Sequence, residues 1–325
     1  MRVLVTGASG YVGSRLVPAL LQAGHQVVVA ARDVAGLDRF SWAGDVERRY
    51  LDVGDTVSVH LAVRDVDAVV YLVHSMGAGS FVDRDREAAE DLVAATTRAG
   101  TERVVYLSGL VPEGQLSDHL RSRHEVEEIL LAGPVPATVL RASMVIGGGS
   151  TSFEVMRRVS ERMPVTTLPT WMRTRIQPIA VEDVVALLVA TLEGAPRNRA
   201  YDVGGDEVLT YAALLDRFAQ AAGLVRPQVR VPLVPAALVG EAVAVLSGLP
   251  RSTVRALVKS LGHDMVCQDD DARSELVPGR RFVTIDEALV RSLVGETRAT
   301  DADGDIQGEA TSDPAWVGTT RRGRT

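Results

Sequence analysis

Glycines at positions 7, 10 and 13 constrain the fold of this chain more than any other feature. They follow a short β-branched run, Arg2–Thr6, and precede an amphipathic stretch that reaches Gln22. In a strand–turn–helix unit of this kind, the first glycine permits the tight turn, the second lets the backbone approach a pyrophosphate, and the third allows the helix to pack closely on the strand. The N–H groups at the start of the helix then bind the phosphates. The pattern predicts a dinucleotide site whose contacts are Gly7, Ser9, Gly10, Tyr11, Val12 and Gly13.

Strand-like and helical segments alternate through the first 150 residues. Such alternation is typical of a parallel, doubly wound sheet, because right-handed crossovers place helices on both of its faces. We therefore expect an α/β fold with a Rossmann domain over residues 1–150. Pro18 predicts a kink in the first helix, since proline cannot donate a backbone hydrogen bond. Further strands are expected at 26–31, 46–51, 68–73, 103–108 and 135–141, and further helices at 57–64, 83–98 and 118–131.

The rhythm changes after residues 147–149, which are all glycine. Helices are expected at 152–162, 181–193 and 210–222, with two more between 235 and 262 and a strand at 201–203. No second glycine fingerprint occurs, so residues 151–295 are expected to form a smaller, mostly helical lobe that carries the substrate side, with a return segment at 176–203. Residues 296–325 are rich in Asp, Gly, Thr and Arg without apolar periodicity, which predicts a disordered tail.

Composition excludes several function classes. A net charge of −7 gives no reason to expect a nucleic acid or an acidic membrane as partner. Cys267 is the single cysteine, so neither an intrachain disulfide nor a thiolate metal cluster can form, and no cluster of His or carboxylate residues has metal-ligand spacing. The longest apolar runs, such as 184–190, are too short to span a bilayer, and no signal-peptide pattern is present. We expect a cytoplasmic location.

The end of the second strand bears on the choice of cofactor. NAD-specific folds usually place a carboxylate there for the ribose 2′-OH, whereas this strand ends in Ala31 and is followed by Arg32. A guanidinium suits a 2′-phosphate, which favours NADP(H) over NAD(H). A surface arginine would give the same pattern, and Asp33 could pair with Arg32 or turn toward the ribose.

Two other strand ends carry candidate cofactor contacts. Asp52 and Val53 end the third strand, where the carboxylate could accept a hydrogen bond from the adenine amino group. Its alternative role is a helix cap, although Asp55 fits that cap better. Val73 and His74 end the fourth strand near the expected position of the ribose and nicotinamide. His74 is either a neighbour of the cofactor or the polar start of a loop.

These segments together resemble the atypical short-chain dehydrogenases/reductases, in particular the NmrA-like NAD(P)H-binding proteins of bacteria. A more distant resemblance links the chain to the nucleotide-binding accessory subunit of respiratory complex I. The resemblance covers about residues 1–295, and only the glycine fingerprint is specific on its own. It implies that Ser143, after the sixth strand, contacts the nicotinamide carboxamide. The matching segments are 6–13, 32, 51–53, 71–77, 106–109, 119–128, 140–143, 176–184 and 201–205.

The usual catalytic pair of such enzymes is missing. Standard members use a serine on the fifth strand, here matched by Ser108, and a tyrosine followed four residues later by a lysine that lowers the tyrosine pKa. Lys259 is the single lysine of the chain, and the residue four positions before it is Arg255. The helix that should carry the pair instead has His119 and Arg123 on one face. His119 could act as a general acid near neutral pH and Arg123 could hold the nicotinamide ribose; alternatively, both are solvated or locally paired.

Two functions from different classes follow. The first is an NADP(H)-dependent oxidoreductase of non-standard chemistry, whose proton comes from His119, from water or from the substrate itself. The second is a non-catalytic sensor or accessory protein that binds the dinucleotide without turning it over. A sugar-nucleotide epimerase ranks below both, because that class also relies on the absent pair. The sequence indicates a small-molecule substrate without identifying it.

Overall fold

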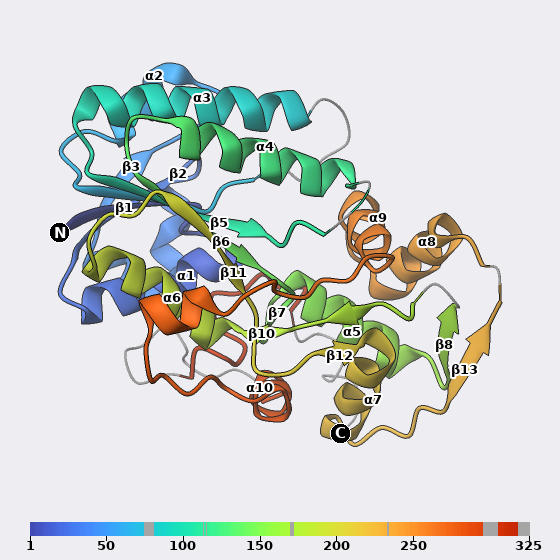
Figure 1. Cartoon of the computed structure of the whole chain (residues 1–325). Coiled ribbons are helices and arrows are strands. Elements are labelled where there is room, and N and C mark those ends of the chain that lie inside the picture. The colour runs from blue at the N-terminus through green and yellow to red at the C-terminus, as the bar shows by residue number, and fades with distance from the viewer. Residues whose placement is uncertain are drawn as a thin grey trace.

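The computed structural model describes residues 1–74, 81–112, 114, 116–169, 172–232, 234–294 and 305–317. Seven parallel strands form the central sheet in the order β11-β6-β5-β4-β1-β2-β3 (Figure 1). The chain winds outward from β1 in both directions, so the expected Rossmann-type α/β fold is confirmed. The strands are β1 (Arg2–Thr6), β2 (Gln26–Ala31), β3 (Glu47–Tyr50), β4 (Ala68–Tyr71), β5 (Arg103–Gly109), β6 (Ala137–Ala142) and β11 (Arg199–Val203).

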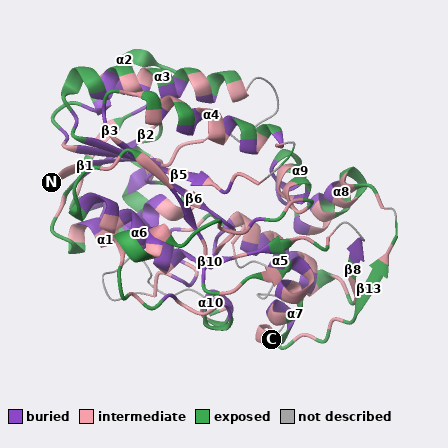
Figure 2. Ribbon diagram, viewed as in Figure 1, coloured by how far each residue is buried: buried purple, intermediate pink, exposed green. Residues whose placement is uncertain are grey.

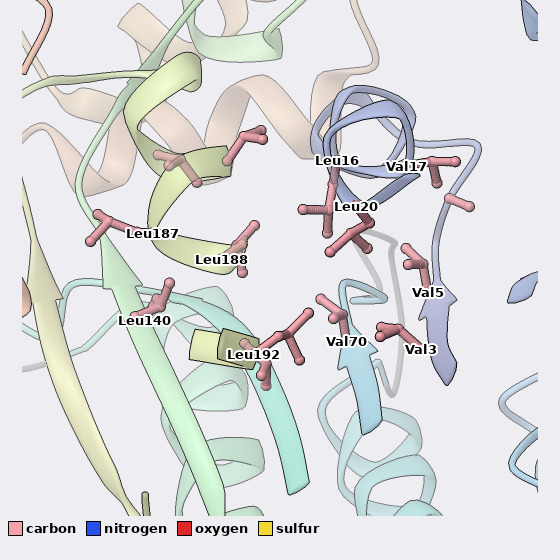
Figure 3. Packing of buried hydrophobic residues seen from close by; sticks show 14 of the residues in the cluster. Val3, Val5, Leu16, Val17, Leu20, Val70, Leu140, Leu187, Leu188 and Leu192 are labelled. Carbon is pink, nitrogen blue, oxygen red and sulfur yellow. The ribbon is translucent and has the colours of Figure 1, made fainter. Parts of the chain in front are cut away.

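Helices cover both faces of this sheet (Figure 1). Helices α1 (Tyr11–Gln22) and α6 (Val181–Glu193) lie on one face, and α2 (Thr56–Ala62), α3 (Phe81–Ala99) and α4 (Asp118–Ala132) lie on the other. Figure 3 shows the first of these layers, where Leu20 of α1 and Leu188 of α6 meet Val70 and other strand residues. The inner strands are mostly buried on both faces, as the purple ribbon of Figure 2 shows, which explains their largely apolar sequences, whereas the edge strand β3 is polar and partly exposed.

Helix α1 continues through Pro18, and a side chain from outside the helix replaces the missing hydrogen bond. Proline has no N–H, so the carbonyl of Ser14, four residues earlier, loses its usual donor. The indole N–H of Trp42 donates to that carbonyl instead, over 3.2 Å. Trp42 lies in the 3₁₀ turn η2 (Ser41–Gly44), is 3% exposed and stacks on Phe40 with ring centroids 4.6 Å apart. The turn between β2 and β3 therefore completes the hydrogen bonding of α1.

The second half of the chain builds a lobe beside the carboxyl edge of the sheet. Its helices are α5 (Thr151–Arg162), α7 (Tyr211–Ala221), α8 (Ala236–Ser247), α9 (Arg251–Ser260) and α10 (Ile285–Ser292). Three pairs of short strands brace it: β7 (Val145–Ile146) with β10 (Ile179–Ala180), β9 (Arg175–Ile176) with β12 (Leu209–Thr210), and β8 (Thr166–Pro169) with β13 (Gln228–Val231). The segment 176–203 returns to the nucleotide-binding domain, because it supplies α6 and the edge strand β11.

Residues 305–317 pack against the nucleotide-binding domain, which differs from the disorder expected for 296–325. The guanidinium of Arg15, on α1, donates to the carboxylate of Asp313 at 2.8 and 3.0 Å. Gln307 is fully buried and donates from Nε2 to the carbonyl of Ile146. A Cβ atom at Gly148 would lie 2.6 Å from the backbone nitrogen of Glu309, so the glycine run gives this segment its path. Polar and backbone contacts, with only scattered apolar ones from Ile306 and Trp316, hold the segment, which explains why apolar periodicity did not reveal it.

Candidate functional site

The glycine turn has the geometry of a phosphate cradle. Gly7 adopts a φ of +70°, and the N–H of Gly10 donates to the carbonyl of Gly7 over 2.9 Å. A Cβ atom at Gly13 would lie 2.3 Å from that same carbonyl oxygen, so only glycine allows the helix to approach the strand this closely. Helix α1 begins after Gly10 without a side-chain cap. Its first N–H groups are therefore suited to an anion, and the residues present fit a dinucleotide pyrophosphate.

Two arginines flank this turn. Arg32 is exposed directly after β2 and forms no ion pair with any described residue. Asp33 does not pair with it: its carboxylate accepts a hydrogen bond from the N–H of Gly36 over 2.9 Å. Arg39, in the 3₁₀ turn η1 (Ala35–Arg39), donates to the carbonyl of Ser9 over 3.4 Å. Arg39 could not be predicted from the sequence, because nothing in a non-periodic turn indicates which element its side chain will contact.

Asp52 lies after β3 and uses one carboxylate oxygen locally, to accept a hydrogen bond from the N–H of Gly54 over 3.1 Å. Asp55 caps α2 by accepting a hydrogen bond from the N–H of Val57, so Asp52 has no role in that cap. Val53 is partly buried against the core beneath α2, α3 and α4. The carboxylate of Asp52 thus remains a candidate for the adenine, and Val53 contributes mainly to packing.

Four polar side chains lie near the carboxyl ends of β4 and β5. The rings of His74 and His119 lie 5.9 Å apart between centroids, at an angle of 57°. Arg123, one turn along α4 from His119, donates to the carbonyl of Leu107 over 3.5 Å. Ser108 is 2% exposed, and its Oγ makes no hydrogen bond of standard geometry to a described residue, although the phenol of Tyr106 neighbours it. The i, i+4 spacing on α4 therefore places Arg123 against the serine strand and His119 beside His74.

Burial and charge control the protonation of the two histidines. Burial, followed by the charge of Arg123, lowers the pKa of His119 to about 4. The charge of Arg123, followed by burial and by the proximity of His119, lowers the pKa of His74 well below its usual value. Both imidazoles are neutral at pH 7. His119 can donate a hydrogen bond from its neutral ring, which differs from the protonated acid expected near neutral pH.

Ser143 and Val73 are placed differently from each other. Ser143 is buried after β6, where its hydroxyl donates to the carbonyl of Met265 over 3.2 Å and its N–H to the carbonyl of Val203 over 3.0 Å. It ties the sheet edge to the lobe. The side chain of Val73 packs into the core beneath α2, α3 and α4.

A cavity of about 750 Å³ joins these groups and extends into the lobe. It is lined at one end by the glycine turn and then by the polar cluster, and Ser9, Arg32, Asp52, Val53 and Val73 lie outside its lining. The structure therefore unites most of the predicted cofactor and catalytic residues around one space. Those that line it are Gly7, Gly10, Tyr11, Val12, Gly13, His74, Ser108, His119, Arg123 and Ser143.

Within the described ranges, no helix combines the length and apolar character needed to cross a bilayer. In the same part of the chain, no three His, Cys, Asp or Glu side chains come together as a metal-binding group.

Comparisons with known proteins agree with this geometry. A family model described as NAD(P)H-binding matches residues 7–193. The sterol demethylase protein B of Methylococcus capsulatus is 26% identical over 264 residues, which cover 71% of this chain and 78% of that protein. Subunit 9 of the NADH dehydrogenase 1 alpha subcomplex of Arabidopsis thaliana is 28% identical over 217 residues, 63% of this chain and 54% of the subunit, so the match spans about half of that relative.

A solved structure shows the same fold. The NADPH-dependent quinone oxidoreductase of Escherichia coli, in complex with NADPH, superposes with a TM-score of 0.72 at 19% identity, over 88% of this chain and 98% of that one. With the family model covering more than half of the sequence, the chain belongs to the NAD(P)H-binding family, and it is similar in sequence to complex I subunit 9.

Proposed function

We propose that the chain is an NADP(H)-dependent oxidoreductase that reduces a carbonyl group or a conjugated double bond. The observation that carries the proposal is the shared cavity, in which the glycine turn and the cluster of Ser108, His119 and Arg123 line one continuous space. A cofactor held by the turn would place its reactive ring toward the carboxyl edge of the sheet, where this cluster lies. The relative from Escherichia coli, by its description, uses NADPH to reduce quinones.

The preference for NADP(H) is supported by the two arginines beside the turn. Neither position 31 nor position 32 is acidic, and the carboxylate of Asp33 is engaged by Gly36. Arg32 and Arg39 offer guanidinium groups to a 2′-phosphate, and a hydrogen bond to a charged group contributes about 1.5–3 kcal/mol.

A fluorescence titration tests this preference. NADPH should bind more tightly than NADH, and Arg32→Ala or Arg39→Ala should each weaken NADPH binding roughly tenfold at low salt. The affinity for NADH, which lacks the 2′-phosphate, is the internal control and should change little. Tighter binding of NADH by the unaltered protein would refute the assignment.

The residues of the cluster can stabilise the charge that develops during reduction. When bound, NADPH would supply the hydride for the electrophilic carbon and become NADP⁺, and a proton from water would complete the alcohol or the saturated carbonyl compound. Ser108 and the neutral ring of His119 can donate hydrogen bonds to the substrate oxygen. The positive charge of Arg123 favours negative charge on that oxygen, and a partly buried position strengthens the interaction.

Stopped-flow oxidation of NADPH with a panel of aldehydes, ketones and enones tests the reaction. Ser108→Ala should lower kcat roughly 10- to 100-fold while the affinity for NADPH is retained, because the hydroxyl acts on the substrate oxygen. Ser252→Ala, on the exposed surface of α9, is the matched control and should have no effect. Equal rates for Ser108→Ala and the unaltered protein would remove the serine from the mechanism.

A second candidate function is a dinucleotide-binding accessory protein without turnover. The single lysine favours it, because no Tyr-x-x-x-Lys pair can exist in this sequence. The plant relative is, by its name, a subunit of an NADH dehydrogenase complex. Tight NADPH binding together with no oxidation across the panel would support this function over the first.

A further inference from the structure

We infer that the natural ligand of the lobe is a neutral, elongated and largely apolar molecule, such as a long-chain aliphatic ketone or enone. The inference rests on the proposed reduction for the position of the reactive group, but not for the binding of the apolar chain. It is carried by the outer part of the same cavity, which is lined by residues of α5, α7, α8 and α9.

Helix α5 forms a wall along the length of this outer part. The cavity is lined by Ser152, Val155, Met156, Val159, Ser160 and, just beyond the helix, Met163. These positions recur every three to four residues, so they share one face of the helix. The helix has 12 residues, and at 1.5 Å per residue the lined face extends for about 18 Å. A ligand that lies along this face of α5 is therefore elongated.

The other face of α5 is polar and is already occupied. Glu154, Arg157 and Arg158 are buried there; Arg157 pairs with Glu154 and Glu309, and Arg158 contacts Trp316. The helix thus separates a charged interior, closed by residues 305–317, from an apolar interior. On the apolar face, Val155 packs with residues of α8 and α9 and Met156 with residues of α7, and the space left beside this face is the cavity.

Helices α8 and α9 complete the apolar enclosure. Leu238, Ala242 and Leu246 recur every four residues on α8, and Leu257 and Leu261 do the same at the end of α9; all line the cavity. Leu238 is also 62% exposed, which places an apolar side chain at the mouth.

Charge is confined to the inner end. Among the described residues that line the cavity, Arg123 is the single permanently charged one, and no carboxylate or lysine is present. A charged group placed deep in the outer part would therefore be desolvated without a partner, which is costly. The volume of about 750 Å³ belongs to the whole cavity, so a ligand in the lobe shares it with the cofactor end. A neutral chain with one polar, reducible end satisfies all of these constraints.

The test uses straight-chain 2-ketones from 2-hexanone to 2-dodecanone with the full-length protein. Binding is measured by displacement of the neutral apolar dye Nile red, and turnover is measured separately by NADPH oxidation. Burial of each added methylene should strengthen binding about threefold to fourfold until the chain fills the cavity. Binding that rises with chain length without any oxidation would sustain this inference and count against the proposed reduction. Affinity independent of chain length, or preference for short charged ketones such as pyruvate, would overturn the inference even if NADPH oxidation occurred.

Matched variants locate the binding in the lobe. Val159→Phe fills the cavity midway along α5, and the loss of affinity should grow with chain length, reaching about tenfold for 2-dodecanone, the equivalent of roughly two methylenes. Ala256→Phe, from α9, should act in the same direction. Val245→Phe is the control, because Val245 is 68% exposed and lies outside the lining. Retained NADPH affinity and thermal unfolding temperature show that each variant is folded. Equal effects of Val159→Phe and Val245→Phe would overturn the inference.

Discussion

His119 illustrates how one partly buried residue links the candidate site to stability. Burial and the charge of Arg123 lower the pKa of His119 to about 4 in the folded protein, whereas the unfolded chain has the ordinary value of about 6.5. Between these values the unfolded state binds more protons than the folded state. This contribution to stability is therefore complete above about pH 6.5 and is lost as the pH falls toward 4.

We predict that His119→Gln, which cannot be protonated, removes this part of the acid sensitivity. Between pH 6.5 and 4 the unaltered protein should lose up to about 3 kcal/mol more unfolding free energy than the variant, since each pKa unit corresponds to about 1.4 kcal/mol. Urea denaturation at a series of pH values measures the difference. Above pH 7 the gap between the two proteins should be constant. A gap that is the same at pH 4.5 as at pH 7 would show that His119 titrates alike in both states.

Some site residues could be predicted from the sequence because they depend on local rules. The glycine turn follows from spacing alone, and the ends of parallel strands share an edge, so Ser108 and the face of α4 that carries His119 and Arg123 were expected near it. The contact of Arg39 with Ser9 could not be predicted, because it depends on how a 3₁₀ turn folds back over the glycines. The neutral state of His119 was also beyond reach, because the burial of its ring depends on tertiary packing.

At the scale of elements, α1 depends on a hydrogen bond from outside the helix. The indole of Trp42 donates to the carbonyl of Ser14, which Pro18 leaves without its usual donor. A buried carbonyl without any partner costs roughly 1–3 kcal/mol. The bond also anchors the turn that follows β2, and with it the segment that carries Arg39.

We predict that Trp42→Phe lowers the unfolding free energy by about 2–4 kcal/mol, because it combines the unsatisfied carbonyl with a loss of packing. The double-mutant cycle with Pro18→Ala isolates the hydrogen bond. Alanine restores an N–H four residues after Ser14, so Trp42→Phe should cost about 1 kcal/mol less in that background. Additive effects of the two substitutions would mean that the indole N–H contributes nothing to the stability of α1.

Long helices and strands with a clear apolar pattern were predicted more accurately than short ones. The bounds of β1, β2 and α6 were predicted to the residue, because long apolar runs end there at glycine or polar positions. The two-residue strands β7, β9, β10 and β12 could not be predicted, since two residues carry no alternation. Which of these short strands pair with each other depends on the tertiary packing of the lobe. The helix α10 and the π-helical turn η3 (Ala272–Leu276) were missed as well.

At the scale of the whole molecule, residues 305–317 bind to α1, the first helix of the chain, through Arg15. The side chain of Arg15 has no exposed surface, and besides Asp313 it donates to the carbonyls of Tyr11, Gly148, Ile306 and Gly308. In the sequence, the one sign of this contact is the position of Arg15 within the apolar pattern of α1. A sequence without apolar periodicity predicts disorder, but here a buried charge replaces an apolar core as the anchor.

Asp313→Ala should therefore be strongly destabilising. Removal of one partner leaves the fully buried guanidinium of Arg15 without its counter-charge, which costs about 3–5 kcal/mol. Asp38→Ala is the matched control, because Asp38 pairs with Arg48 at the surface with 72% of its side chain exposed, and such a pair contributes less than about 1 kcal/mol. Urea denaturation at pH 7 compares the two variants. If Asp313→Ala were no more destabilising than Asp38→Ala, residues 305–317 would lie on the surface without stabilising the first helix.

The pair of Arg15 and Asp313 connects the glycine turn, the 147–149 loop and the polar face of α5. Loss of the pair should therefore also weaken NADPH binding, measured by the same fluorescence titration.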